Sequence, residues 1–595
     1  MQPSYLRYIG IQNLRIFSKY TDFDFRPITV LTGKNSSGKS SLIKALLLFK
    51  ETFETINNLN ILQFESANLG SFSNNVSRGN LKQKNSMVFS FEISFPFLED
   101  EFLLTFHFFN PNNTNSPMAA TYPKEIRVVR RKDEKVVFSF KDGDWDSTDG
   151  QQYLISYDLN DIFSECYDKM VTYIVNSAEK PKTKINPDAW MDEIVKEIEQ
   201  QKKLRKDPQF HSTSKTFDSK RALQDLQPET IKLISDHIKS KEPLFRCISD
   251  LVEIPFSKKE KEILKPIDYL SNLGEPIVFW QAMSPDIYGS MGYHNIFIRV
   301  SEYFDYVFTR AEDIQTEKIQ EVLGMQGHYA KINEVVKIVL INGFLKPIEN
   351  FEKWLSSTLK ATHHLPPSRL NHERVNMIKG NTVVKSMIEF DENKFLGFQS
   401  GQEFLKYAID LFEIPGIPVV RTFEGQAAAI HIQNEGVESS LADYGFGFSQ
   451  LIPLVITIYN TAKSSLDDFD SNETFFTNSI IIIEEPEANL HPNFQSKIAD
   501  LISEASRCFG IQFIIETHSE YIIRKLQYLT AKKEIKPSDT AIYYFSNPLK
   551  LKKGEEQIKR MNIRKDGFID EDFGEGFFDE STRLTLELLK LQSLN

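Results

Sequence analysis

The chain has 595 residues but only three cysteines, no long apolar run and no excess of positive charge. Cysteines this widely spaced exclude a disulfide framework and a cysteine metal motif, and they favour the reducing cytoplasm. The longest apolar runs, such as Ile480–Ile483, are far too short to cross a bilayer, so no membrane partner is expected. The first residues lack the charged and apolar regions of a secretory signal.

The composition is that of an ordinary globular protein, with 41% hydrophobic and 26% charged residues. Its length predicts roughly three or four domain-sized units. The net charge of −12 does not favour a chain coated in nucleic acid, because phosphate binding needs clustered lysine and arginine. A local basic stripe is still compatible with this balance.

The segment Gly33–Ser40 matches the phosphate-binding pattern G-x-x-x-x-G-K-[ST]. It follows an apolar run, Ile28–Leu31, that predicts a buried strand, and it precedes a predicted helix. Glycines let backbone N–H groups turn toward phosphate oxygens, and the helix start adds its positive dipole end. Lys39 is expected to reach the β- and γ-phosphates of ATP, and the Ser40 hydroxyl to bind Mg²⁺. The predicted nucleotide-binding residues are Gly33, Lys34, Asn35, Ser36, Ser37, Gly38, Lys39, Ser40 and Ser41.

A second motif is the strand Ile480–Ile483, which ends in Glu484 and Glu485. A buried strand that ends in acidic residues is the Walker B arrangement, which places a carboxylate near Mg²⁺. Adjacent side chains at a strand end point in different directions. We therefore assign Glu484 to the metal and Glu485 to the water that attacks the phosphate. The alternative is a strand that ends in a solvated acidic turn.

Two further segments bear on the same chemistry. The predicted strand Phe513–Ile515 is followed closely by His518, which is expected to contact the γ-phosphate, although a lone histidine is more often structural. The glycine-rich segment Asp443–Gln450 leads into an apolar helix and predicts an anion-binding helix start, with a flexible turn as the alternative. Its candidate nucleotide contacts are Gly445, Gly447, Ser449 and Gln450.

Both end regions of the chain alternate strands with helices, which predicts an α/β fold with a parallel core sheet. Segments of nearly period-two apolar residues predict additional antiparallel strands. These are Ser86–Ile93, Phe102–Phe109, Glu125–Val129 and Lys135–Phe140. In the second half, the predicted elements are strands at Ile417–Thr422 and Ala427–Gln433, a helix from about Ser449 with Pro453 in its first turn, a charged loop at Ser464–Asn472, a helix at Phe494–Arg507 and a strand at Gln512–Ile515.

The two ends are therefore expected to build one ATPase head around an insertion. We predict four parts along the chain. They are the N-terminal half of the head with a β subdomain (1–155), a mainly helical insertion (156–412), the C-terminal half of the head (413–545) and a C-terminal tail (546–595). No apolar heptad pattern persists long enough to predict a long coiled coil.

The order of phosphate loop, signature segment, Walker B strand and switch histidine resembles the ABC-type ATPase heads of the SMC/RecF/OLD-like superfamily. The segment Glu484–Pro492 is especially similar to a bacterial branch that includes OLD nucleases and anti-phage defence ATPases. The resemblance implies a head-to-head homodimer, in which ATP lies between the phosphate loop of one subunit and the signature of the other. It also implies that Arg15, in the early segment Leu14–Phe17, lies near the nucleotide.

The chain departs from the pattern of this superfamily at several positions. In the signature, Gly447 stands at the usual serine position and Ser449 at a glycine position. His491 replaces the usual aspartate of the D-loop, and no glutamine of the Q-loop can be placed. The residues of the phosphate loop and the Walker B strand are therefore firmer candidates than any contact made across a dimer.

Four functions are candidates for a protein with this ATPase head. The first is the ATPase subunit of a defence complex, similar to the ATPases of Septu-like systems, which regulates a separate nuclease of the HNH type. The second is an OLD-type nuclease, for which Asp570–Asp572 is the only candidate metal site in the tail. The third is a stand-alone RecF/SMC-like DNA-repair ATPase, which needs the basic segment Lys550–Lys565 to bind DNA. The fourth, a transporter subunit, fits poorly with the large insertion.

Overall fold

The computed structural model describes residues 5–169 and 343–592, both with gaps, and the short stretch 277–281. The longest gaps inside these ranges are 78–85, 111–120 and 471–478. The chain divides into two compact units. The first comprises Met1, Ile93–Leu103 and Arg127–Asn350, and the second comprises Gln2–Glu92, Leu104–Ile126 and Phe351–Asn595. Most of the predicted insertion therefore lies outside the described residues.

In the first unit, three strands pair antiparallel in the order β7 (Lys135–Asp146), β8 (Gly150–Tyr157) and β9 (Ile277–Gln281). A bulge between Asp142 and Trp145 shifts the register of the first pair. Aromatic side chains contribute to the described core of this unit, where the ring of Phe344 stacks on Phe95 with centroids 5.1 Å apart. The strands β5 (Phe102–Phe109) and β6 (Tyr122–Arg130) and the helix α11 (Lys346–Lys360) each run across the division between the units.

The second unit contains an antiparallel group of strands, in the order β2 (Thr21–Asp24), β1 (Tyr8–Gln12) and β4 (Ser86–Ile93). The rings of Phe89 and Phe91 on β4 pack edge-on against Phe49, at 4.8 Å and 5.1 Å. Phe49 lies on α1 (Lys39–Ile56), the helix that follows the phosphate loop. This aromatic contact packs α1 against the antiparallel strands. The short helix α2 (Phe72–Asn75) also lies in this part of the unit.

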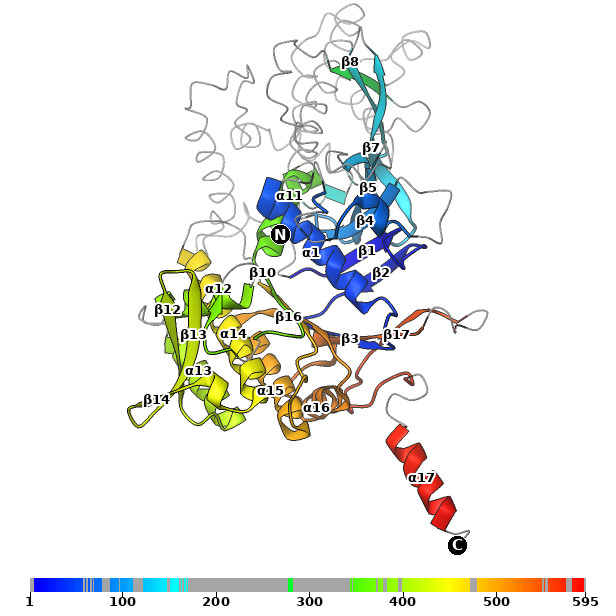
Figure 1. Cartoon of the computed structure of the whole chain (residues 1–595). Coiled ribbons are helices and arrows are strands. Elements are labelled where there is room, and N and C mark those ends of the chain that lie inside the picture. The colour runs from blue at the N-terminus through cyan, green and yellow to red at the C-terminus, as the bar shows by residue number, and fades with distance from the viewer. Residues whose placement is uncertain are drawn as a thin grey trace, which may run out of the picture. The chain divides into compact units, whose positions relative to one another are not determined.

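The centre of the second unit is a six-stranded sheet in the order β10-β15-β16-β3-β17-β18. The first five strands are parallel and β18 is antiparallel. Their bounds are β10 (Thr362–Leu365), β15 (Ile480–Glu484), β16 (Gln512–Glu516), β3 (Ile28–Gly33), β17 (Thr540–Phe545) and β18 (Ile558–Met561). Near-continuous apolar runs such as Ile480–Ile483 are fully buried, because helices cover both faces of a parallel sheet. Figure 1 shows α1 on one side of this sheet and α15 (Pro492–Phe509) and α16 (Glu520–Ala531) on the other.

The long helix α14 (Phe446–Asp470) packs against several of the remaining elements. A small antiparallel sheet is ordered β11-β13-β12, with β14 paired to β13. Two helices, α12 and α13, pack against α14. Their bounds are β11 (Asn376–Met377), α12 (Thr382–Asn393), α13 (Gln399–Phe412), β12 (Ile417–Phe423), β13 (Ala427–Asn434), β14 (Val437–Ser440), and the 3₁₀ turns η4 (Leu441–Asp443) and η5 (Pro537–Asp539). The last described element is α17 (Glu580–Gln592).

The predicted α/β fold, with a parallel core sheet and separate antiparallel strands, is confirmed. Two local predictions were wrong. The range Ser464–Asp470 continues α14 instead of forming a loop, because it contains neither glycine nor proline to end the helix. Because α14 begins at Phe446, Pro453 lies inside the helix and not in its first turn. Proline there removes one backbone hydrogen bond. Burial of the apolar neighbours offsets this loss; they are Leu451, Ile452, Leu454 and Val455.

None of the helices in the described part of the chain has the length and apolar content needed to cross a membrane. Within the predicted insertion, the described residues are not all helical. The strand β10 pairs with the Walker B strand β15 and forms the edge of the core sheet. The boundaries between the four predicted parts stay a prediction.

Candidate active site

The predicted motifs meet at one edge of the parallel sheet. The strands β15, β16 and β3 are neighbours, and all three end at this edge. In the register of β15 and β16, Glu484 lies directly beside Glu516. Parallel register places side chains at equivalent positions on the same face. The acidic pair, the switch histidine and the phosphate loop are thereby brought together, as the sequence predicted for His518 beside the Walker B strand.

The phosphate loop has the backbone that its glycines predict. Gly33 has φ +123° and Gly38 has φ +116°, conformations that are costly for other residues. A Cβ at Gly33 would lie 2.2 Å from the carbonyl oxygen of Phe545, and one at Gly38 would lie 1.9 Å from Ile16 Cδ1. Ser36, between them, also has a positive φ of 57°. The loop therefore winds so tightly that only glycine fits at these two positions.

Contacts from the C-terminal half of the chain hold the loop in place. The Lys34 amide donates to the carbonyl of Phe545 at 3.0 Å, and Gln557 Nε2 donates to the carbonyl of Ser37 at 2.9 Å. The Ser37 hydroxyl closes the loop onto the Lys34 carbonyl at 2.5 Å. Ser37 in the loop and Ser41 in the helix after it are buried. The exposed loop positions, which remain open to a ligand, are Lys34, Asn35, Ser36 and Ser40.

Lys39 is buried beneath the loop, with 3% of its surface exposed. Its ammonium group donates to the carbonyls of Gly33 at 3.2 Å and Lys34 at 2.9 Å. Burial lowers the pKa of Lys39, while the nearby carboxylates Glu516 and Glu485 oppose that shift. Lys39 is thus folded back toward the loop, at the centre of the predicted phosphate site.

The two Walker B acids lie in different environments. Glu484 is half-buried, and its Oε1 lies 2.7 Å from His364 Nε2 on β10. Glu485 is exposed and has a positive φ of 45°. Its amide donates to the carbonyl of Glu516 at 2.8 Å, which holds this unusual backbone conformation. The directions and the roles assigned to the two side chains stay a prediction.

Glu516 is an acidic residue of the site that sequence reasoning left without a role. Its Oε2 accepts from the Ser40 hydroxyl at 3.2 Å, and its Oε1 lies 3.8 Å from Lys39 Nζ. Burial raises the pKa of Glu516 to about 7; Lys39 opposes the shift, and the charges of Glu484 and Glu485 add to it. A carboxylate therefore occupies the position between the phosphate-binding lysine and the metal-binding serine.

The switch segment is tied to the loop after the Walker B strand. Glu487 accepts from the His518 amide and from the Thr517 hydroxyl, both at 2.7 Å. Burial raises the pKa of Glu487 and lowers that of His518. The charges of Lys39 and Glu485 also act on the pKa of His518, so its imidazole lies close to both. The structure thus brings His518 to the predicted site, and Glu487 is the residue that positions it.

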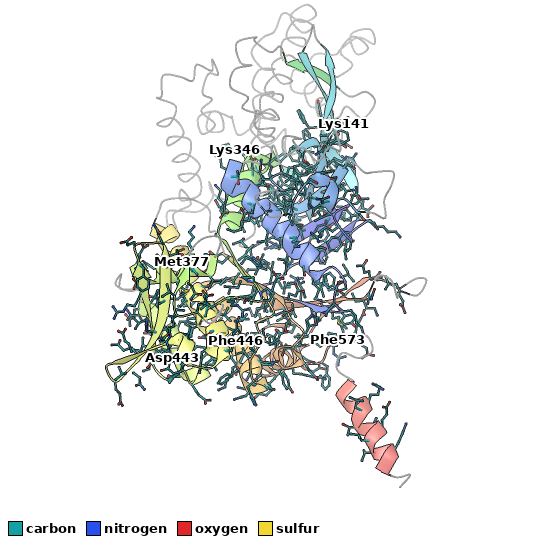
Figure 2. All side chains as sticks on the ribbon, in the orientation of Figure 1. Lys141, Lys346, Met377, Asp443, Phe446 and Phe573 are labelled. Carbon is teal, nitrogen blue, oxygen red and sulfur yellow. The ribbon has the colours of Figure 1, made fainter. Side chains whose placement is uncertain are left out.

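The signature segment is only partly exposed. Gly445 and Phe446, at the start of α14, face solvent, and Figure 2 labels Phe446 together with the neighbouring Asp443. Ser449 and Gln450 are each 2% exposed. A Cβ at Gly447 would lie 3.1 Å from Leu490 Cδ2, so the start of the helix packs on the segment after Walker B. In this conformation, Ser449 and Gln450 are covered by their own chain.

Arg369 explains why Gln450 points inward. Its guanidinium donates to Gln450 Oε1 at 3.3 Å and to the Glu484 carbonyl at 3.1 Å. The side chain is buried, and this burial lowers the pKa of Arg369 to about 10 despite the charges of Glu487 and Glu485. It follows β10, so it lies at the same sheet edge as the Walker B acids. No motif in the sequence marks Arg369 or His364, which lie far from their partners along the chain.

Arg15 lies in the loop that packs on Gly38, since its neighbour Ile16 contacts that glycine. Its backbone has a positive φ of 52°, and its guanidinium donates to Asn75 Oδ1 at 3.4 Å. Burial lowers the pKa of Lys44 on α1, and the charge of Arg15 adds to that shift. Arg15 is therefore close to the phosphate loop, and its contact with nucleotide stays a prediction.

These residues fit a magnesium nucleotide. The tight loop at Gly33 and Gly38 leaves backbone N–H groups as donors for phosphate oxygens. The exposed Ser40 hydroxyl and the Glu484 carboxylate are hard oxygen ligands of the kind that Mg²⁺ takes. Lys39 supplies the positive charge.

A model of the AAA ATPase domain matches residues 5–523 of the chain. The chain belongs to the AAA ATPase domain family. A second model, "Protein of unknown function (DUF3696)", matches residues 535–588 of this AAA ATPase. The family match confirms the ATPase domain that the motifs predict. No curated protein matches the chain.

Solved structures that match this AAA ATPase include Smc heads. One is the Smc head domain with an extended coiled coil, bound to the C-terminal domain of ScpA, from Pyrococcus furiosus. It is 13% identical with a TM-score of 0.32, and the match covers 99% of this chain and 100% of that one. Another is the Smc head domain with a coiled coil and joint from Pyrococcus yayanosii. It is 12% identical with a TM-score of 0.32, and the match covers 95% of this chain and 98% of that one.

Replacing Arg369 by methionine should lower the free energy of unfolding by about 2–4 kcal/mol, because two buried acceptors lose their donor. Urea denaturation measures this change. Arg374→Met is the matched control, since Arg374 is exposed and its ion pair with Asp443 at 2.6 Å is worth about 1 kcal/mol or less. Equal destabilisation by the two variants would contradict the role given to Arg369.

Proposed function

We propose that the chain is an ATPase subunit that binds ATP with Mg²⁺ and hydrolyses it at the edge of the parallel sheet. One observation carries the proposal: Lys39, Ser40, Glu484 and Glu485 converge at the ends of adjacent strands. Mg²⁺, when bound, neutralises phosphate charge. Lys39 binds the phosphates, while Ser40 and Glu484 hold the metal.

Hydrolysis then depends on a base beside the phosphate. Glu485 is exposed at the site and accepts a proton from the water that attacks the γ-phosphorus. The bond from that phosphorus to the bridging oxygen breaks, and ADP leaves with the electron pair. His518 lies close to Lys39 and Glu485, and it orients the γ-phosphate. Glu487 holds His518 in this position through its backbone amide.

The biological role we propose is an anti-phage defence complex in which ATP-dependent head dimerisation regulates a separate nuclease. Support comes from the motif order, from the segment Glu484–Pro492, and from the large insertion in place of a long coiled coil. In the trans arrangement, the exposed start of α14 at Gly445 would face the partner's nucleotide. Ser449 and Gln450 would have to leave Arg369 to take part.

The other candidate functions have less support among the described residues. In the basic segment, Arg560 pairs with Asp24 at 2.6 Å and Arg564 with Asp566 at 3.1 Å, which reduces the charge that a repair ATPase would offer to DNA. In the tail, the Asp570 carboxylate accepts from the Asn562 amide and side chain, both at 2.8 Å. Asp570 thus serves a turn, although an OLD-type nuclease would use it for metal.

A native pull-down of the tagged chain from its host tests the biological role. The eluate is analysed by mass spectrometry and assayed for DNA cleavage with and without ATP. We expect a stoichiometric nuclease and cleavage that responds to ATP, with the response lost when the bait carries Lys39→Ala. A lone protein that binds DNA without cutting it would favour the repair ATPase. Cleavage by the lone chain would favour a nuclease.

A further inference from the structure

Glu516 contacts both Lys39 and Ser40, the two side chains of the phosphate loop that would bind a magnesium nucleotide. Its Oε2 accepts from Ser40 at 3.2 Å, and its Oε1 forms an ion pair with Lys39 at 3.8 Å. The carboxylate itself is only 9% exposed, so the pair lies away from solvent, where screening is weak. Its backbone is fixed within β16 between two parallel neighbours. Glu516 is therefore held at this position by the sheet.

The charges around Lys39 are unbalanced. Glu484 and Glu516 stand side by side in the register of β15 and β16. Both Glu485 and Glu516 act on the pKa of Lys39, and Glu484 and Glu485 act on that of Glu516. Glu516 and Glu485 thus act directly on Lys39, and Glu484 stands beside Glu516, at the position where anionic phosphates must bind. Like charges in a partly buried site repel strongly.

We propose that Glu516 competes with the phosphates for Lys39 while it holds Ser40, and thereby makes nucleotide binding depend on Mg²⁺. This inference rests on the proposed ATP binding. Free ATP must displace a carboxylate and approach two others, so it binds weakly. Lys39 and Ser40 would leave Glu516 for the ligand when a divalent cation binds with the phosphates, because the cation would offset the charge of Glu516. Glu516 is a positioning residue in this scheme, since it acts through Lys39 and Ser40.

The test measures the Kd of a fluorescent ATP analogue for the full chain, once with Mg²⁺ and once with EDTA. Glu516→Gln keeps the shape of the side chain and removes its charge. At about pH 8.5, above the pKa of about 7 to which burial raises Glu516, we expect the Kd in EDTA to fall about tenfold, because one unit of repulsion is lost, while the Kd in Mg²⁺ changes less. The ratio of the two constants should therefore fall by about tenfold.

Glu520→Gln is the matched control. It removes the same charge close by in the sequence, from a partly exposed residue on α16 that pairs with Arg524 at 3.2 Å. For this control, the ratio of the Kd in EDTA to the Kd in Mg²⁺ should equal that of the wild type. Melting curves identify a variant that does not fold, and Glu516→Ala then removes the same charge without a buried amide.

The outcomes separate this inference from the proposed function. If the wild type binds ATP and Glu516→Gln has the same ratio of Kd values, the proposed competition by Glu516 is wrong, while the proposed ATP binding still holds. Absence of wild-type binding under both conditions would overturn both. A reduced ratio in Glu516→Gln together with a wild-type ratio in Glu520→Gln would establish Glu516 as the competitor.

Discussion

Lys39→Ala should weaken ATP binding by about 100-fold or more. The expected loss corresponds to a charge-assisted contact with the β- and γ-phosphates, worth about 1.5–3 kcal/mol, together with the lost neutralisation of the surrounding acids. Lys39 is 3% exposed and no other lysine is shown beside the loop carbonyls of Gly33 and Lys34, within the described residues. Titration with a fluorescent ATP analogue in Mg²⁺ measures the effect.

The control for this variant is Lys50→Ala. Lys50 lies on the same helix α1 and pairs with Glu54 at 2.6 Å, away from the phosphate loop. An i,i+4 pair of this kind contributes about 0.3–0.5 kcal/mol to stability, so ATP binding should be unchanged. Binding by Lys39→Ala within about threefold of the wild type would contradict the phosphate site. Thermal melting of both variants separates lost binding from lost folding.

Local sequence patterns predicted the parts of the site that depend on local chemistry. The phosphate loop could be predicted because its glycines, Lys39 and Ser40 act within one strand–loop–helix segment. The Walker B strand could be predicted because four buried isoleucines end in two acids. In both cases the residues that act together are also adjacent in the chain, so their spacing alone carries the information.

The parts that escaped prediction depend on pairing between distant segments. His364 and Arg369 reach the site only because β10 pairs with β15, about a hundred residues later in the chain, and a short strand has little sequence signal. Glu516 gains its role from the lateral register with Glu484. The inward direction of Gln450 likewise follows from the burial of Arg369. Such relations are set by tertiary packing and leave no local motif.

Glu485→Gln should lower the rate of ATP hydrolysis by about 10²–10⁴-fold and leave ATP affinity nearly unchanged, because the amide cannot accept the proton of the attacking water. Malachite green or coupled-enzyme assays measure turnover, and the fluorescent analogue measures binding. In the proposed dimer, blocked hydrolysis should also leave ATP-bound heads associated. Light scattering after ATP addition tests for this larger species.

Glu484→Gln is the comparison that makes the Glu485 experiment decisive, because the two variants carry the same chemical change at adjacent positions. Glu484 is half-buried beside His364 and is proposed to hold the metal, whereas Glu485 is exposed and turned by its positive φ. Glu484→Gln should therefore raise the Mg²⁺ concentration needed for half-maximal turnover, and Glu485→Gln should not. Full turnover by Glu485→Gln would remove it as the catalytic base. Indistinguishable Mg²⁺ dependence in the two variants would mean that the pair acts as one unit, against the division of roles that their different environments support.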